Sequence, residues 1–192
     1  MPIEGRSLKK AANTFREHLN QVLAKTITPA PVSMVIEPGG AARMSFRSGG
    51  VVSGVTIATR RGEAELFLLQ VCDSDVDGSG LHQLRTQKYT YTITPAAHAQ
   101  PLLRWEYVRD REPEHARWCR HHLQGPVKLS WGDGLSLNDW HLPTGYVPFE
   151  EVIRFCIDDL GVKPLSAEWH EVLDESYRKF TTSFSTYPAR GH

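Results

Sequence analysis

Paired cysteines are missing from this chain. Its three cysteines, Cys72, Cys119 and Cys156, are widely spaced, and no C-x-x-C pair occurs. A disulfide framework and a zinc knuckle both depend on closely patterned cysteines, so neither is indicated. We expect reduced and buried thiols.

Long hydrophobic runs are also absent. No apolar stretch approaches the ~18 residues that a membrane span needs. Residues 1–25 are polar and lack the apolar core of a secretory signal. We therefore expect a cytoplasmic protein that does not associate with a membrane.

Neither sign of charge is in excess, since Lys and Arg together number 22 and so do Asp and Glu. Domains that bind nucleic acid through its phosphates are usually strongly basic, so this balance argues against such a domain while leaving room for a local basic patch. The chain also lacks a phosphate-binding glycine loop and the G-x-S-x-G element of serine hydrolases. Any function must therefore be sought in side-chain clusters.

The remaining pattern predicts helices at both ends of the chain and strands between them. Residues 1–27 carry apolar positions at helical spacing, and Ser7 is a suitable N-cap. Residues 31–143 contain alternating segments typical of strands, and the stretch 65–72 is apolar on both faces, which predicts a central strand. Residues 147–186 predict a pair of helices, the first ended by Gly161.

Segregated runs of strands and helices favour the α+β class. We expect residues 1–192 to form one domain, since no linker divides the chain. Its predicted architecture is a curved, predominantly antiparallel sheet of about eight strands, with one N-terminal helix and two C-terminal helices.

An acidic segment at 73–78, DSDVDG, matches the first half of an EF-hand calcium loop. The second half does not match, because Leu84 stands at position twelve, where that loop needs a glutamate. We therefore interpret the segment as an acidic hairpin loop.

The later strands concentrate the side chains with the clearest chemical potential. Strand alternation puts Arg104 and Glu106 on one face of their strand, and Arg120 and His122 on one face of the next. If the two strands pair antiparallel, these four side chains meet. His141 then arrives at the edge of the sheet.

This cluster contains the groups that metal-independent cleavage of RNA requires. A His or Glu acts as base on the 2′-hydroxyl, a second His protonates the leaving oxygen, and an Arg stabilises the phosphorane charge. The same groups also suit an acidic partner or a small anion. They equally suit ordinary pairing of Arg with Glu across a solvated sheet face.

A metal site is a weaker interpretation of the histidines. His121 and His122 point to opposite faces of a strand, and neither an H-x-H nor an H-x-x-x-H pair occurs. No cofactor is expected.

Three segments within residues 89–160 follow one another as LLRWEY, RHHLQ and HLPTGYVPFEEVIRF. This order resembles the TumE-like toxins of bacterial toxin–antitoxin systems and related uncharacterised proteins, in which an L-x-R-aromatic strand precedes a histidine-rich strand and a short helix. The resemblance implies a bacterial cytosolic protein encoded beside a DNA-binding regulator. It does not fix a reaction.

The sequence is therefore compatible with two functions, and it does not decide whether the protein is an enzyme. The first is a toxin-like or defence-associated enzyme that acts on RNA or another phosphate ester. The second is a non-catalytic subunit that binds a cognate protein partner. An enzyme should gather its site residues in one concave pocket, whereas an interaction subunit should spread them over a flat face. The candidate site residues are Arg104, Glu106, Arg120, His122 and His141.

Overall fold

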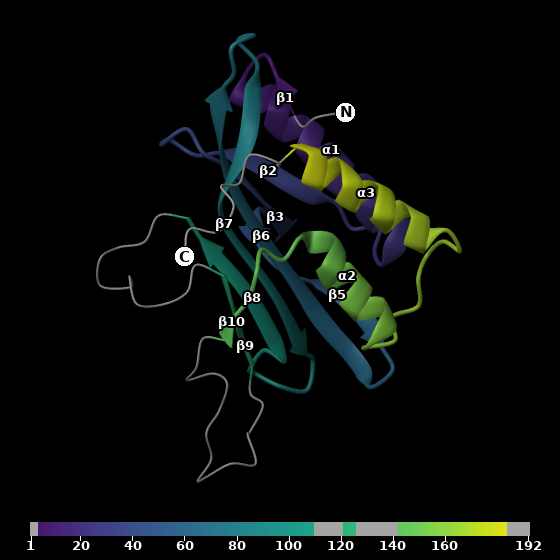
Figure 1. The fold of residues 1–192 in the computed structure, drawn as a ribbon. Coiled ribbons are helices and arrows are strands. Elements are labelled where there is room, and N and C mark those ends of the chain that lie inside the picture. The colour runs from purple at the N-terminus through teal and green to yellow at the C-terminus, as the bar shows by residue number, and fades with distance from the viewer. Residues whose placement is uncertain (1–3, 110–120, 126–141, 184–192) are drawn as a thin grey trace.

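A large antiparallel sheet dominates the structure, a computed structural model that describes residues 4–109, 121–125 and 142–183 (Figure 1). Within these residues the sheet has ten strands, and its main path runs in the order β10-β9-β8-β7-β6-β3-β2. The strands are β1 (Glu4–Gly5), β2 (Val32–Ile36), β3 (Ala42–Ser48), β4 (Val51–Val52), β5 (Val55–Thr59), β6 (Gly62–Val76), β7 (His82–Pro95), β8 (Leu103–Val108), β9 (His121–Gln124) and β10 (Leu142–Pro143). Off the main path, β1 pairs with β7, β4 with β3, and β5 with β6.

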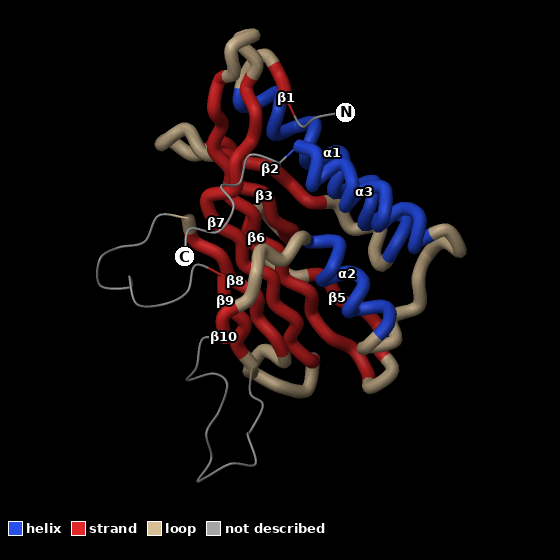
Figure 2. Tube along the Cα trace, viewed as in Figure 1, coloured by secondary structure: helices blue, strands red, loops and turns tan. Residues whose placement is uncertain are grey.

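Three helices cover one face of this sheet (Figure 2). They are α1 (Leu8–Thr26), α2 (Phe149–Asp158) and α3 (Trp169–Ser183). The predicted α+β class, with a curved antiparallel sheet, one N-terminal helix and two C-terminal helices, is confirmed. No helix in the described part of the chain is long and apolar enough to cross a membrane.

The helix boundaries follow local signals in the sequence. The Ser7 hydroxyl accepts a hydrogen bond from the Lys10 amide at 3.2 Å and caps α1, as predicted. Pro148 occupies the N-cap position of α2, and Glu150 follows in the first turn at the positive end of the helix dipole. Gly161 lies just beyond the end of α2 with φ of 70°, a left-handed conformation that glycine adopts without strain.

The central position predicted for residues 65–72 is confirmed, because β6 pairs with β7 on one side and with β3 and β5 on the other. Leu66 and Leu68 point toward the helices and are fully buried in the core. Phe67 and Leu69 point to the opposite face, called here the outer face, and are half-buried. The hydrophobic core therefore lies mainly between the sheet and its helices.

The interpretation of the acidic segment 73–78 as a loop is wrong for most of its length. Residues 73–76, expected in a loop, continue β6, and only Asp77 begins the turn to β7. In that turn the Asp77 carboxylate accepts hydrogen bonds from the amides of Ser79 and Leu81. The strand is longer than expected because Ser74 and Asp75 keep their pairing with β7 despite their polar side chains.

A buried polar chain joins the three helices. The Ser176 hydroxyl of α3 donates a hydrogen bond to the Glu150 carboxylate of α2. Nε2 of His18, from α1, lies 2.8 Å from the same hydroxyl oxygen. Burial raises the pKa of Glu150 and lowers the pKa of His18. Ser176 is therefore the shared partner of two groups that are costly to bury alone.

Removal of this hydroxyl is expected to destabilise the protein. Ser176→Ala leaves Glu150 and His18 without their common partner, so we expect the free energy of unfolding to fall by about 1–3 kcal/mol. Urea denaturation measures the change. Ser48→Ala, at an exposed position, is the matched control and should alter stability by less than about 0.5 kcal/mol. Equal stability of the two variants would show that the hydrogen bonds of Ser176 contribute nothing to the stability of the fold.

Candidate functional site

The two strands expected to carry the site pair as predicted. Strands β8 and β9 are antiparallel neighbours, and their register sets Glu106 opposite His122 and Arg104 opposite Gln124. Because side chains alternate along a strand, all four lie on the outer face, away from the helices. Sequence alternation thus placed Arg104, Glu106 and His122 correctly on one surface.

Glu106 and His122 form a direct contact. Nε2 of His122 lies 3.2 Å from Oε2 of Glu106, and the Thr90 hydroxyl of β7 donates to Oε1 of Glu106 at 3.4 Å. The His122 side chain is only 8% exposed, whereas that of Glu106 is 23% exposed. Solvent therefore reaches the carboxylate more readily than the imidazole that holds it.

The electrostatic surroundings of Glu106 favour its ionised form. Burial alone would raise its pKa, but the His122 hydrogen bond and the positive charge of Arg104 bring the pKa below its usual value, with Lys88 contributing in the same direction. Glu106 is therefore a carboxylate throughout the physiological range of pH.

Arg104 is the cation of this site. It lies two residues before Glu106 on β8 and is half-buried. In the described part of the chain no hydrogen bond or ion pair engages its guanidinium, which leaves its N–H groups for an anion. The site on the described residues thus combines a held carboxylate with a neighbouring guanidinium.

Two predicted site residues, Arg120 and His141, lie outside the described residues. The register sets His122, and not its neighbour His121, opposite Glu106. His121 points toward the helices, where its ring stacks on Tyr107 with centroids 4.4 Å apart. Its ring therefore belongs to the aromatic packing on the inner face.

That inner-face packing accounts for the tyrosines of the central strands. Tyr89 stacks on Tyr91 with centroids 4.7 Å apart, and Tyr146 meets the Tyr89 ring edge-on at 5.3 Å. The Tyr91 hydroxyl donates to the buried Gln70 amide oxygen at 2.7 Å. Of the described tyrosines here, Tyr89, Tyr91 and Tyr107 are buried, so they stabilise the core and are not an exposed binding surface.

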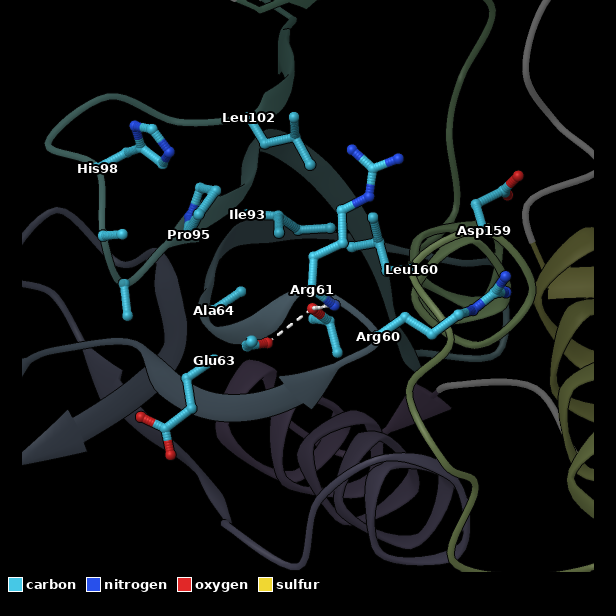
Figure 3. A pocket seen from close by; sticks show the side chains of 14 residues that line it. Arg60, Arg61, Glu63, Ala64, Ile93, Pro95, His98, Leu102, Asp159 and Leu160 are labelled. Atoms are coloured by element: carbon cyan, nitrogen blue, oxygen red, sulfur yellow. Dashed lines mark hydrogen bonds between the residues drawn. The ribbon is translucent and has the colours of Figure 1, made fainter.

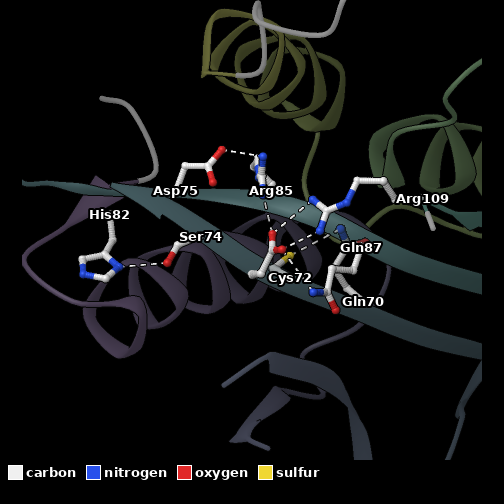
Figure 4. Close-up of polar contacts among 9 residues, drawn as sticks. Gln70, Cys72, Ser74, Asp75, His82, Arg85, Gln87 and Arg109 are labelled. Carbon is white, nitrogen blue, oxygen red and sulfur yellow. Dashed lines mark hydrogen bonds and ion pairs between the residues drawn. The ribbon is translucent and has the colours of Figure 1, made fainter. Parts of the chain in front are cut away.

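A second polar cluster occupies the outer face further along β6 and β7 (Figure 4). Asp73 accepts hydrogen bonds from the Arg109 guanidinium and, at 3.1 Å, from the Gln87 amide. Arg85 lies between Asp73 and Asp75 and pairs with both. Burial would raise the pKa of Asp73, but these hydrogen bonds lower it below its usual value. The cluster is internally paired, as a stabilising surface network is.

This second cluster is not among the predicted sites, although the sequence contains a signal for it. Asp73 and Asp75 alternate along β6, and Arg85 and Gln87 alternate along β7, so a tight hairpin between them would bring opposite charges together. Cross-strand pairing sets Asp73 directly opposite Arg85.

A metal centre gains no support from these side chains. No group of three or more His, Cys, Asp or Glu residues within the described ranges is arranged to hold a metal ion. Cys72 and Cys156 are buried, and burial raises the pKa of each thiol to about 12, so both are inert.

Comparison with known proteins identifies no relative, since no family model, curated protein or solved structure matches this chain. The resemblance to TumE-like toxins stays a prediction. The geometry and chemistry of the site itself are therefore the guide to function.

Proposed function

We propose that the outer-face site of Arg104, Glu106 and His122 cleaves RNA at phosphodiester bonds without a metal ion. The observation that carries this proposal is the carboxylate of Glu106, held by His122 and Thr90 beside the guanidinium of Arg104, which makes no hydrogen bond or ion pair with another described residue. A base and an anion-binding group side by side supply two of the three groups that such chemistry needs, and the third is an acid for the leaving oxygen.

In the proposed reaction Glu106 takes the proton of a ribose 2′-hydroxyl. The 2′-oxygen attacks the adjacent phosphorus, the bond from phosphorus to the 5′-oxygen breaks, and the products are a 2′,3′-cyclic phosphate and a 5′-hydroxyl. Arg104 balances the negative charge that builds on the phosphorane oxygens. The leaving 5′-oxygen takes a proton from an acid, a role that we assign to His141, the predicted site histidine outside the described residues.

His122 acts in this scheme as a positioning residue. Its side chain is too buried to offer a substrate much contact area. Its hydrogen bond instead holds the Glu106 carboxylate in place. A lowered pKa makes Glu106 a weaker base but keeps it ionised, so its accurate placement matters more than its basicity.

His122→Gln should therefore change how cleavage depends on pH. Cleavage falls on the acidic side as Glu106 gains a proton, and the His122 hydrogen bond holds that pKa below its usual value of 4.5. Weakening this contact raises the pKa of Glu106, so we expect the acidic limb of the pH–rate profile to move to higher pH. A profile that keeps its acidic limb while only its height falls would contradict this role.

The first test of the proposed activity is incubation of purified protein with total cellular RNA, with and without EDTA. Cleavage that persists in EDTA supports the proposal. Cleavage that EDTA abolishes would instead indicate a metal-dependent enzyme. Intact RNA after incubation with folded protein would contradict an RNA-cleaving function.

The alternative of a protein-binding subunit has one specific observation in its favour. Strand β2 ends the main path of the described sheet, and its residues Val35 and Ile36 are 44% and 37% exposed. The Asn20 side chain already bonds both backbone groups of Val32, which closes one end of this edge. The remainder suits addition of a strand from a cognate protein. Intact RNA would favour this function.

A further inference from the structure

A cavity of about 720 Å³ lies where the β5–β6 turn, the connection from β7 to β8 and the end of α2 meet (Figure 3). Its size falls within the range of about 300–1,000 Å³ that is typical of small-molecule sites. None of the residues proposed to cleave RNA lines it. It is therefore a separate candidate site that is independent of the proposed function.

The floor of this cavity is apolar. Ala64 and Ile93 are buried, while Leu102 and Leu160 are half-buried and line the walls. A ligand that rests on these side chains removes apolar surface from water, which favours binding. The cavity thus suits a molecule with a hydrocarbon body.

One wall of the cavity is held in place by Arg60. Its amide donates to the Leu160 carbonyl at 2.8 Å, and its guanidinium donates to the Asp158 carbonyl at 3.1 Å. Gly161 allows this close approach, because a Cβ there would lie 2.3 Å from Nε of Arg60. The Arg60 guanidinium thus binds the carboxyl end of α2.

The neighbouring Arg61 makes no such contact with the described part of α2. It is exposed, and Figure 3 shows its side chain rising over the apolar floor between Leu102 and Leu160. No hydrogen bond or ion pair to another described residue holds its guanidinium. The acidic lining residues Glu63 and Asp159 turn their carboxylates away from it (Figure 3). Arg61 thus presents an available bidentate donor at the mouth of an apolar cavity.

We propose that this cavity binds small monocarboxylates that have an apolar chain. The carboxylate pairs with the Arg61 guanidinium, and the hydrocarbon chain lies on Ala64, Ile93, Leu102 and Leu160. His98, at the rim, offers a second polar contact. Each methylene that reaches the floor should tighten binding about fourfold until the floor is covered.

Isothermal titration calorimetry with hexanoate and octanoate tests this proposal on the full chain. We expect saturable binding of both acids, with octanoate the tighter ligand. Octan-1-ol and octylammonium, which share the chain but not the carboxylate, should bind more weakly. Equal or tighter binding of either control, or no saturable binding of octanoate, would overturn the proposal.

Arg61→Gln provides the decisive variant. Its position is exposed, so the variant should keep the wild-type thermal midpoint, which is measured alongside. We expect the Kd for octanoate to rise about tenfold, because one charge-assisted contact is lost. Arg6→Gln, which removes an exposed arginine elsewhere, should leave that Kd unchanged. An unchanged Kd in Arg61→Gln would show that Arg61 does not hold the ligand.

Discussion

Glu106→Gln should lower the rate of RNA cleavage in EDTA by about 10²- to 10⁴-fold, the usual contribution of a positioned acid–base group. Glutamine keeps the size of the side chain and still accepts a hydrogen bond from His122 or Thr90. It cannot take up the 2′-hydroxyl proton. The loss should therefore appear in the rate at saturating RNA rather than in RNA affinity.

The control for this variant is Glu65→Gln. Glu65 is an exposed glutamate of β6, and β7 lies between that strand and β8, which carries Arg104 and Glu106. The Glu65→Gln variant should cleave RNA at the wild-type rate. If Glu106→Gln retained more than about a tenth of the wild-type rate while remaining folded, Glu106 would not be the base.

Leu68→Ala should have the largest effect on stability among the changes considered. Leu68 is 1% exposed on the inner face of β6, where it packs in the core beneath the helices. Truncation of a buried leucine costs about 2–5 kcal/mol, because buried methyl groups are lost and a cavity remains. Urea denaturation gives the free energy of unfolding directly.

Leu69→Ala is the matched comparison for that change. It is the same substitution at the next residue of the same strand, on the outer face, where the leucine is half-buried. It should cost less than half as much as Leu68→Ala. Similar losses at both positions would mean that the outer face is packed as tightly as the inner one, contrary to the one-sided core described above.

The sequence predicted the architecture because each element carries its own local signal. The apolar spacing of residues 8–26 and the Ser7 cap define α1, and two-sided apolarity places β6 at the centre. Alternation likewise assigned Arg104 and Glu106 to one face. These features depend on neighbours in the chain, so a single sequence contains them.

The pairing of β8 with β9 could not be predicted with the same precision. Residues 110–120 separate the two strands, and a connection of this length does not fix the register as a tight turn does. A shift of one residue would have set His121 opposite Glu106. Only the fold reveals that His122 takes that place.

Other features depend on contacts between distant segments. The hydrogen bonds that join His18, Ser176 and Glu150 link three helices, and no local sequence pattern predicts them. The register between β6 and β7 also shifts between Val71 and Cys72. This shift immediately precedes Asp73, the residue that accepts a hydrogen bond from Arg109. Such irregularities arise from packing of the whole sheet and leave no clear mark in the sequence.

Cleavage of a short oligonucleotide with a single ribonucleotide tests the central claim most directly. Purified protein is incubated in EDTA with this substrate and with an otherwise identical all-deoxy strand, and the product ends are identified by mass spectrometry. The account predicts one cut, after the ribonucleotide, with a 2′,3′-cyclic phosphate and a 5′-hydroxyl, and no cut in the all-deoxy strand. Cleavage of both strands, or of neither, would contradict a reaction that begins at the 2′-hydroxyl.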